Sequence, residues 1–167
     1  SDANTAVNLS GSGGGGDFKI DGKVAITNGT VDINSGGGSI EITGVVTGSD
    51  GGNEILELDD GGVGSSGAIT LGGHVGAAAD NASLIQTVKL TAAGGINLAG
   101  DITTSNQAGS VDIAGPVTLK GDITIDANAA ATTVTFNSTA TVNSDSTAGG
   151  RAFEVNTSTG DLKMQGV

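Results

Sequence analysis

The sequence predicts an all-β fold, a right-handed parallel β-solenoid of triangular cross-section, on three observations. A nine-position pattern, Gly-x-Φ-x-Φ-x-Gly-x-Φ with Φ apolar, recurs along a chain of 167 residues. Glycine is abundant, at 31 residues, whereas proline occurs once and tryptophan and tyrosine are absent. Within each copy the apolar positions alternate with period 2, which is the signature of a strand. Short strands that repeat at a fixed interval are typical of solenoids.

Each copy of the pattern predicts a three-residue strand, a glycine corner and a second strand. The copies begin at Gly16, Gly38, Gly67, Gly94, Gly109 and Gly115, and a truncated copy begins at Gly160. Glycine at the corner permits a positive φ, so that a short strand can turn sharply. A single strand of this length is unstable alone, but stacked coils satisfy one another's backbone hydrogen bonds.

Arranged as successive coils, the strands form three columns, one for each face. The first holds Phe18/Ile20, Ile40/Ile42, Ile69/Leu71, Ile96/Leu98, Val117/Leu119, Ala140/Val142 and Leu162/Met164. The second holds Val24/Ile26, Val46, Val75, Ile102 and Ile123/Ile125. The third holds Val31/Ile33, Leu56/Leu58, Val88/Leu90, Val111/Ile113, Val134/Phe136 and Phe153/Val155. This spacing predicts about six to seven coils of about 22–29 residues.

Residues 16–167 are expected to form one solenoid domain. Residues 1–15 are predicted to be a flexible Gly/Ser-rich segment or a strand exchanged with a neighbouring molecule. The longest intervals, Val46 to Leu56 and Val75 to Val88, are expected to project as corner loops that carry any recognition. An antiparallel β-sandwich is the alternative fold. It is disfavoured because it needs no repeating unit and its core is usually richer in aromatic residues.

The repeats resemble those of a known family. The runs GAITLGGHVG, GGINLAGDITTS and GSVDIAGPVTLKGDITIDA look like the filamentous-haemagglutinin-type repeats of very large bacterial surface and secreted adhesins. The resemblance covers about residues 16–167, and its motif specifies the coil without binding chemistry. It implies a segment of an extracellular or cell-surface protein. The implied partners are other copies or adjacent repeats, and a host or neighbouring-cell surface.

The charge balance narrows the partners further. Six Lys and Arg against 18 Asp and Glu give a net charge of −12, and the cations are scattered. Nucleic-acid binding requires clustered positive charge, so no nucleic-acid partner is expected. No apolar run approaches the ~20 residues of a membrane span. Because the chain begins with serine and its single methionine is Met164, we expect a processed product or a piece of a longer protein.

One acidic segment, SDGGNEILELDDGG, is the best candidate for a metal site. Its carboxylates are Asp50, Glu54, Glu57, Asp59 and Asp60. Calcium prefers several such oxygens, so a low-affinity calcium site is the functional hypothesis, and no other cofactor is expected. The calcium-roll nonapeptide and the EF-hand loop both fail to match. The favoured interpretation is a solvated acidic corner that keeps the rod soluble.

Catalytic chemistry is poorly supported by the residue inventory. His74 is the only histidine and cysteine is absent, so a triad or a zinc site would depend on one corner residue. Paired carboxylates could cleave glycans, but the chain lacks tryptophan and tyrosine to stack sugars. We therefore predict no enzyme, and a non-catalytic structural or adhesive rod. The alternatives are a self-assembling filament subunit and, less favoured, a glycan-active β-helix enzyme.

Overall fold

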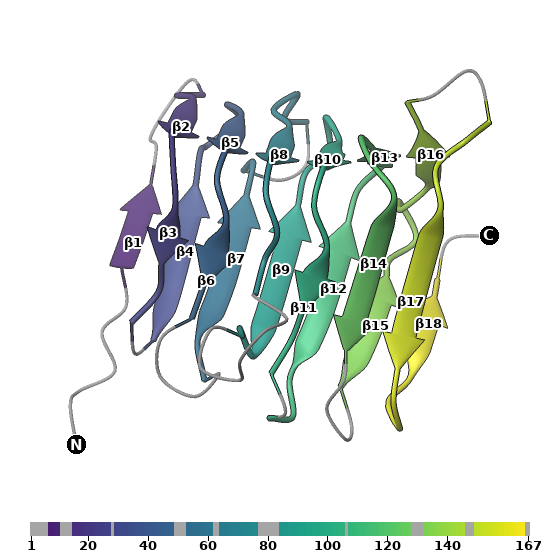
Figure 1. Cartoon of the computed structure of the whole chain (residues 1–167). Helices are drawn as coiled ribbons and strands as arrows, with labels where there is room; N and C mark the ends of the chain where they lie inside the picture. Colours follow the sequence, from purple (N-terminus) through teal and green to yellow (C-terminus); the bar gives the residue numbers. More distant parts are fainter. Residues whose placement is uncertain are drawn as a thin grey trace.

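A computed structural model describes residues 7–10, 15–27, 29–48, 53–61, 64–76, 84–105, 107–127, 132–145 and 149–165. The described residues contain strands and no helix, and every strand pairing is parallel. The strands stack as a three-faced solenoid (Figure 1). This confirms the predicted fold class. Seven strands lie on one face and six on the next, close to the predicted number of coils.

The chain visits three faces in a repeating order. Face 1 holds β1 (Val7–Ser10), β4 (Thr30–Asn34), β7 (Ile55–Asp59), β9 (Thr87–Thr91), β12 (Ser110–Ala114), β15 (Thr133–Phe136) and β18 (Leu162–Met164). Face 2 holds β2 (Phe18–Ile20), β5 (Ile40–Ile42), β8 (Ile69–Leu71), β10 (Ile96–Leu98), β13 (Val117–Leu119) and β16 (Val142–Ser144). Face 3 holds β3 (Val24–Ala25), β6 (Val46–Thr47), β11 (Ile102–Thr103), β14 (Ile123–Ala127) and β17 (Phe153–Thr157), with Val75 bridging β6 to β11.

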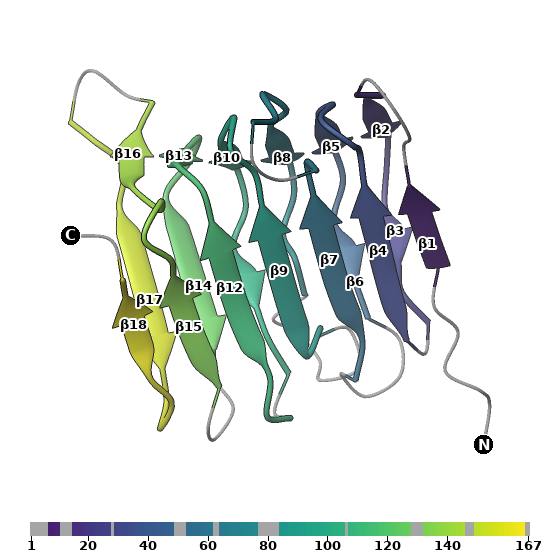
Figure 2. The same ribbon diagram turned by 180° about the vertical axis from the view of Figure 1, so that it is seen from behind.

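The path of the chain is right-handed. In Figure 1 it rises along face 1 at the back, crosses the top through face 2 and descends along face 3 in front while advancing from left to right. Figure 2 shows face 1 from the other side, with β1 and β18 at opposite ends. The right-handed crossover between parallel strands is the usual one.

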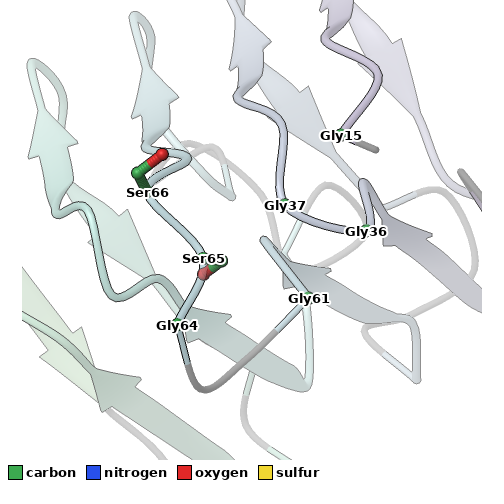
Figure 3. A pocket seen from close by; sticks show the side chains of 7 residues that line it. All are labelled: Gly15, Gly36, Gly37, Gly61, Gly64, Ser65 and Ser66. Atoms are coloured by element: carbon green, nitrogen blue, oxygen red, sulfur yellow. The ribbon is translucent and has the colours of Figure 1, made fainter. Parts of the chain in front are cut away.

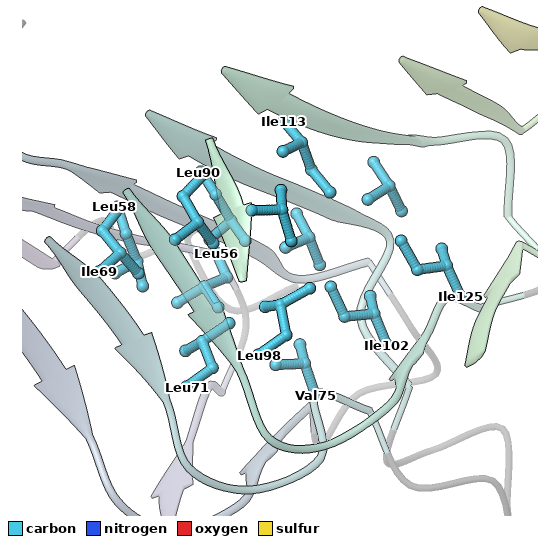
Figure 4. Close-up of a cluster of buried hydrophobic side chains, with 14 of the residues drawn as sticks. Leu56, Leu58, Ile69, Leu71, Val75, Leu90, Leu98, Ile102, Ile113 and Ile125 are labelled. Carbon is cyan, nitrogen blue, oxygen red and sulfur yellow. The ribbon is translucent and has the colours of Figure 1, made fainter. Parts of the chain in front are cut away.

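Like residues stack on like residues inside the coils (Figure 4). On face 2, for example, Ile96 pairs with Ile69 on one side and with Val117 on the other, and all three are fully buried. The aliphatic stacks of the three faces form one continuous core. Near the C-terminal end, the rings of Phe136 and Phe153 meet edge to face at 5.9 Å. The apolar alternation of the sequence therefore specifies the interior of the rod.

The repeat glycines are needed for close approach of the coils more than for positive φ. Of the corner glycines Gly22, Gly44, Gly73 and Gly100, Gly22 alone has a left-handed φ, of 119°. A Cβ at Gly44 would lie 2.3 Å from the carbonyl oxygen of Gly22 in the preceding coil. A Cβ at Gly100 would lie 2.5 Å from the carbonyl carbon of Gly73. The prediction that glycine serves these corners by permitting a positive φ is thus wrong for Gly44, Gly73 and Gly100.

The predicted columns hold as far as Phe136 and then shift. Ala140 is buried at a corner, and face 2 continues with Val142–Ser144, two residues later than predicted. The corner is longer because Asn137 caps it: its Oδ1 accepts a hydrogen bond from the amide of Thr139. In this register Ser144 pairs with Leu119, at a position where the apolar pattern predicts an aliphatic residue.

The last two strands lie one face away from their predicted places. Phe153–Thr157 pairs with β14 on face 3 (the second column), and Leu162–Met164 pairs with β15 on face 1 (the third column). The physical reason is that every face has the same inward alternation, so the Φ-x-Φ pattern alone does not identify a face. On face 3, β3, β6 and β11 have two residues each, whereas β14 and β17 have five and match the length of most face 1 strands, so strand length does not identify the face either.

The second predicted loop, Val75 to Val88, ends in the core. Leu84 and Ile85 belong to the second predicted loop, but they are buried, and Ile85 bridges Thr104 in parallel. This end of the loop contributes to the core because it supplies two adjacent aliphatic side chains. Residues 49–52 and 77–83 lie outside the described residues. At the N-terminus, the backbone of β1 pairs with β4 of the same chain.

Candidate functional site

The acidic segment is divided by the alternation of β7. Glu54 and Asp60, just outside the strand, are buried, whereas Glu57 and Asp59 lie on the outer surface of face 1. Asp50 falls outside the described residues. Among the residues that the structure describes, no three His, Cys, Asp or Glu side chains are grouped to hold a metal ion. The geometry therefore separates the carboxylates that the sequence brings together.

Asp60, Glu57 and Asp59 each have a structural neighbour. The Oδ2 atom of Asp60 accepts a hydrogen bond from the amide of Ala93, at 2.9 Å, and so ties two successive coils together. Glu57 lies 3.5 Å from the ammonium of Lys89 in the next coil. The Oδ1 atom of Asp59 accepts from the amide of Gly61, at 2.9 Å. These contacts favour a structural role, in which the carboxylates stabilise the coils, over the binding of a cation.

Removal of the Asp60 carboxylate is expected to destabilise the coil junction. Asp60→Ala removes the acceptor of this part-buried hydrogen bond, which is expected to lower the free energy of unfolding by about 0.5–1.5 kcal/mol. Asp60→Asn retains an acceptor oxygen and is expected to cost less. Urea denaturation followed by far-UV circular dichroism measures both losses. Equal losses for the two variants would contradict a role for this hydrogen bond.

The outer surface of face 1 carries a ladder of charges. Asp32, Glu57, Lys89 and Asp112 occupy equivalent positions on successive strands. Partial burial and then the carboxylates of Glu57 and Asp59 raise the pKa of Asp32, although Lys89 opposes the shift. The N-terminal part of this ladder therefore has unbalanced negative charge.

The raised pKa of Asp32 predicts a pH-dependent gain from neutralising it. A carboxyl whose pKa is higher in the folded chain opposes folding when ionised, and this cost disappears as the pH falls below the ordinary value of 3.8. Asp32→Asn is therefore expected to raise Tm by about 1–3 °C at pH 7 and low salt. The gain should shrink at acid pH and in high salt.

Asp112→Asn is the matched control in the same ladder. The carboxylate of Asp112 accepts a hydrogen bond from the hydroxyl of Ser110 at 2.6 Å, so its replacement is expected to give no rise in Tm. Thermal unfolding of both variants from pH 3 to pH 8 makes the comparison. A gain for Asp32→Asn that is constant across this range would contradict the electrostatic explanation.

His74 lies at an exposed corner between face 2 and face 3. Its Nδ1 atom accepts a hydrogen bond from the amide of Asp101, at 3.0 Å, and lies 3.5 Å from the Asp101 carboxylate. The imidazole ring therefore connects two successive corners through this hydrogen bond. This geometry suits a structural corner residue, as the sequence predicts.

Two shallow clefts follow the corner between face 1 and face 2. The first, of about 320 Å³, is lined by Gly15, Gly36, Gly37, Gly61, Gly64, Ser65 and Ser66 (Figure 3). The second, of about 370 Å³, is lined by Thr91, Ala93, Ala114, Gly115, Pro116, Asn137 and Thr139. Among the described residues, neither lining contains a titratable or aromatic side chain. The clefts therefore offer backbone groups and hydroxyls, but no acid–base pair.

The C-terminal coil presents the most exposed large apolar side chains of the described residues. On β18, Leu162 is 46% exposed and Met164 is 50% exposed, although both continue the core stack of face 1. Phe153 and Val155 on β17 are only partly buried. This coil, β16–β18, is the strongest candidate for an interaction surface, and the sequence pattern missed it because it predicts all these positions as core.

Comparison with protein-family models, with curated proteins and with solved structures finds no match for the chain. The structure thus supports the solenoid fold without assigning the chain to a family. No helix long and apolar enough to cross a membrane occurs in the described part of the chain.

Proposed function

We propose that this chain is a non-catalytic structural or adhesive segment of a bacterial extracellular surface protein, and that it acts as a rigid rod. The observation that carries the proposal is the unbroken seven-stranded parallel sheet of face 1. Its backbone hydrogen bonds run along the rod axis, so bending must distort many of them together. The continuous aliphatic core holds the strands in register.

Two further observations support a structural role. The described carboxylates of the acidic segment are divided between the interior and the outer surface, and the described residues that line the two clefts include no titratable side chain. The bacterial-surface setting is supported by the resemblance of the repeats to filamentous-haemagglutinin-type sequences. Contact with a host or neighbouring-cell surface belongs to the same proposal.

Electron microscopy of the purified chain, with and without calcium, tests the rod. Seven strands at a spacing of about 4.8 Å give a particle roughly 30 Å long, so we expect short, uniform rods that calcium does not alter. Polysaccharide cleavage by the same preparation, followed as new reducing ends, would contradict a non-catalytic role. Binding of labelled rods to cell surfaces tests the adhesive part.

A self-assembling filament subunit is the second candidate function. It is favoured by the exposed Leu162 and Met164 of β18 and by the position of β16, β17 and β18 as the last strands of their sheets. An uncovered strand edge is a template for another chain. Filaments with an axial repeat of roughly 30 Å in the same micrographs would support this candidate over isolated rods.

A further inference from the structure

The two ends of the rod both carry a strand on face 1. Face 1 runs from β1 to β18, whereas face 2 runs from β2 to β16 and face 3 from β3 to β17. Because the chain visits the faces in the order 1, 2, 3, the strand that continues the stack beyond β18 belongs to face 2. A second copy therefore continues the stack in phase when its β2 pairs with β16 and its β3 pairs with β17. The β4 strand of the second copy then lies beside β18 of the first copy. The β1 strand of the second copy would need the position that β18 of the first copy occupies.

We propose that copies of this chain join end to end, with β18 of one copy replacing β1 of the next copy along the edge of β4. The interaction surface is the C-terminal coil, β16–β18, and its partner is the coil β2–β4 of a second copy. The backbone of β1 then acts as a cap on β4 that must leave before the joint forms. The inference rests on the filament candidate above and specifies its joint.

Apolar side chains meet across this joint in register. Continuing the face 1 ladder places Leu162 beside Val31 and Met164 beside Ile33 of the next copy. On face 3 the ladder aligns Val155 with Val24 of the next copy. The half-exposed Leu162 and Met164 would thereby gain the neighbours that the other core positions already have. Burial of such side chains is the main driving force of association.

Charges on the outer surface are complementary in the same register. Lys163 lies between Leu162 and Met164, so it meets Asp32 of the next copy on face 1. Glu154 precedes Val155, so it meets Lys23 of the next copy on face 3. Partial burial and then the carboxylates of Glu57 and Asp59 raise the pKa of Asp32, so its environment favours such a cation. Two opposite-charge pairs therefore form in this one register, and such complementarity favours this phase of the joint.

Mixed disulfide formation between two full-length variants tests the joint. The chain contains no cysteine, so Lys163→Cys and Asp32→Cys provide single thiols at the two sides of the joint. Lys163→Cys with Asp112→Cys is the matched control, because Asp112 lies on the same ladder in the middle of the rod. We expect the mixed dimer of the first pair to exceed that of the control about tenfold or more, measured by mass spectrometry after mild oxidation.

Removal of the cap is the second arm. Deleting residues 1–14 from the Asp32→Cys variant removes β1, and the yield of the mixed dimer is expected to rise further. Full-length variants that crosslink no better than the control would overturn the joint. A yield that falls after the deletion, with the β-sheet circular dichroism signal retained, would overturn the role of β1 as a cap. Either result leaves the rod function intact, since isolated rods in the micrographs would still support it.

Discussion

Replacing Gly115 with alanine is expected to lower the free energy of unfolding by about 3 kcal/mol or more. Gly115 connects face 1 to face 2 in the middle of the rod. Its φ of 141° is a backbone conformation that residues other than glycine rarely adopt. A Cβ at this position would also lie 2.0 Å from the carbonyl oxygen of Ala92 in the preceding coil. Backbone strain and a backbone clash therefore add, and neither can be relieved by rotating a side chain.

Gly121→Ala is the matched control for this prediction. Gly121 lies at the next corner, and a Cβ there would meet only the carbonyl oxygen of Ala99, at 3.6 Å, which is an ordinary contact. The control is expected to change stability by less than about 1 kcal/mol, and alanine there restricts the unfolded chain. Urea denaturation of the two variants measures the difference. Equal denaturation midpoints would show that the coils do not approach as closely at Gly115 as the structure indicates.

Truncating the core stack in the middle of face 2 is expected to have the second large effect. Leu98 is fully buried and pairs with Leu71 on one side and with Leu119 on the other. Leu98→Ala should cost about 2–5 kcal/mol, from lost burial and the remaining cavity. Because each coil contacts only its neighbours, the defect should also weaken the coupling between the two halves of the rod. A broader or two-step unfolding transition would report this loss of coupling.

Thr118→Ala provides the control on the same face. Thr118 is the outward neighbour of the core residues Val117 and Leu119, so its truncation is expected to change stability by less than about 0.5 kcal/mol. Thermal and urea unfolding of both variants make the comparison. Similar small losses for Leu98→Ala and Thr118→Ala would mean that face 2 does not separate an apolar interior from a solvated surface.

The sequence was sufficient to predict the fold class and most of the register. The overlapping copies at Gly109 and Gly115 were placed in the third and first columns, and β12 and β13 lie on the corresponding faces. This succeeded because coil length is nearly constant there and apolar stacking tolerates few alternatives. It failed beyond Phe136, where the Asn137 corner adds residues and a serine occupies a core-facing position.

The features relevant to function were harder to predict, because they depend on neighbouring coils. The acidic segment is continuous in sequence, but strand alternation sends Glu57 and Asp59 outward while Glu54 and Asp60 are buried. Leu84 and Ile85 were placed in a loop because they lie outside the repeat, yet their adjacent aliphatic side chains were a signal of burial. The exposure of Leu162 and Met164 follows from the position of their coil at the end of the stack, which local patterning does not encode.

The most direct test of the account is the register of β17, since sequence and structure place this strand on different faces. The structure pairs Thr124 with Glu154 on face 3, and the sequence pattern aligns Glu154 with Thr135 on face 1. Neighbouring parallel strands hold paired Cα atoms about 4.8 Å apart, within the range that a disulfide spans. We therefore predict that Thr124→Cys/Glu154→Cys closes an intramolecular disulfide in the oxidised monomer, while Thr135→Cys/Glu154→Cys retains two free thiols. Closure of the second pair alone, or of neither pair, would contradict the parallel three-faced stack described above.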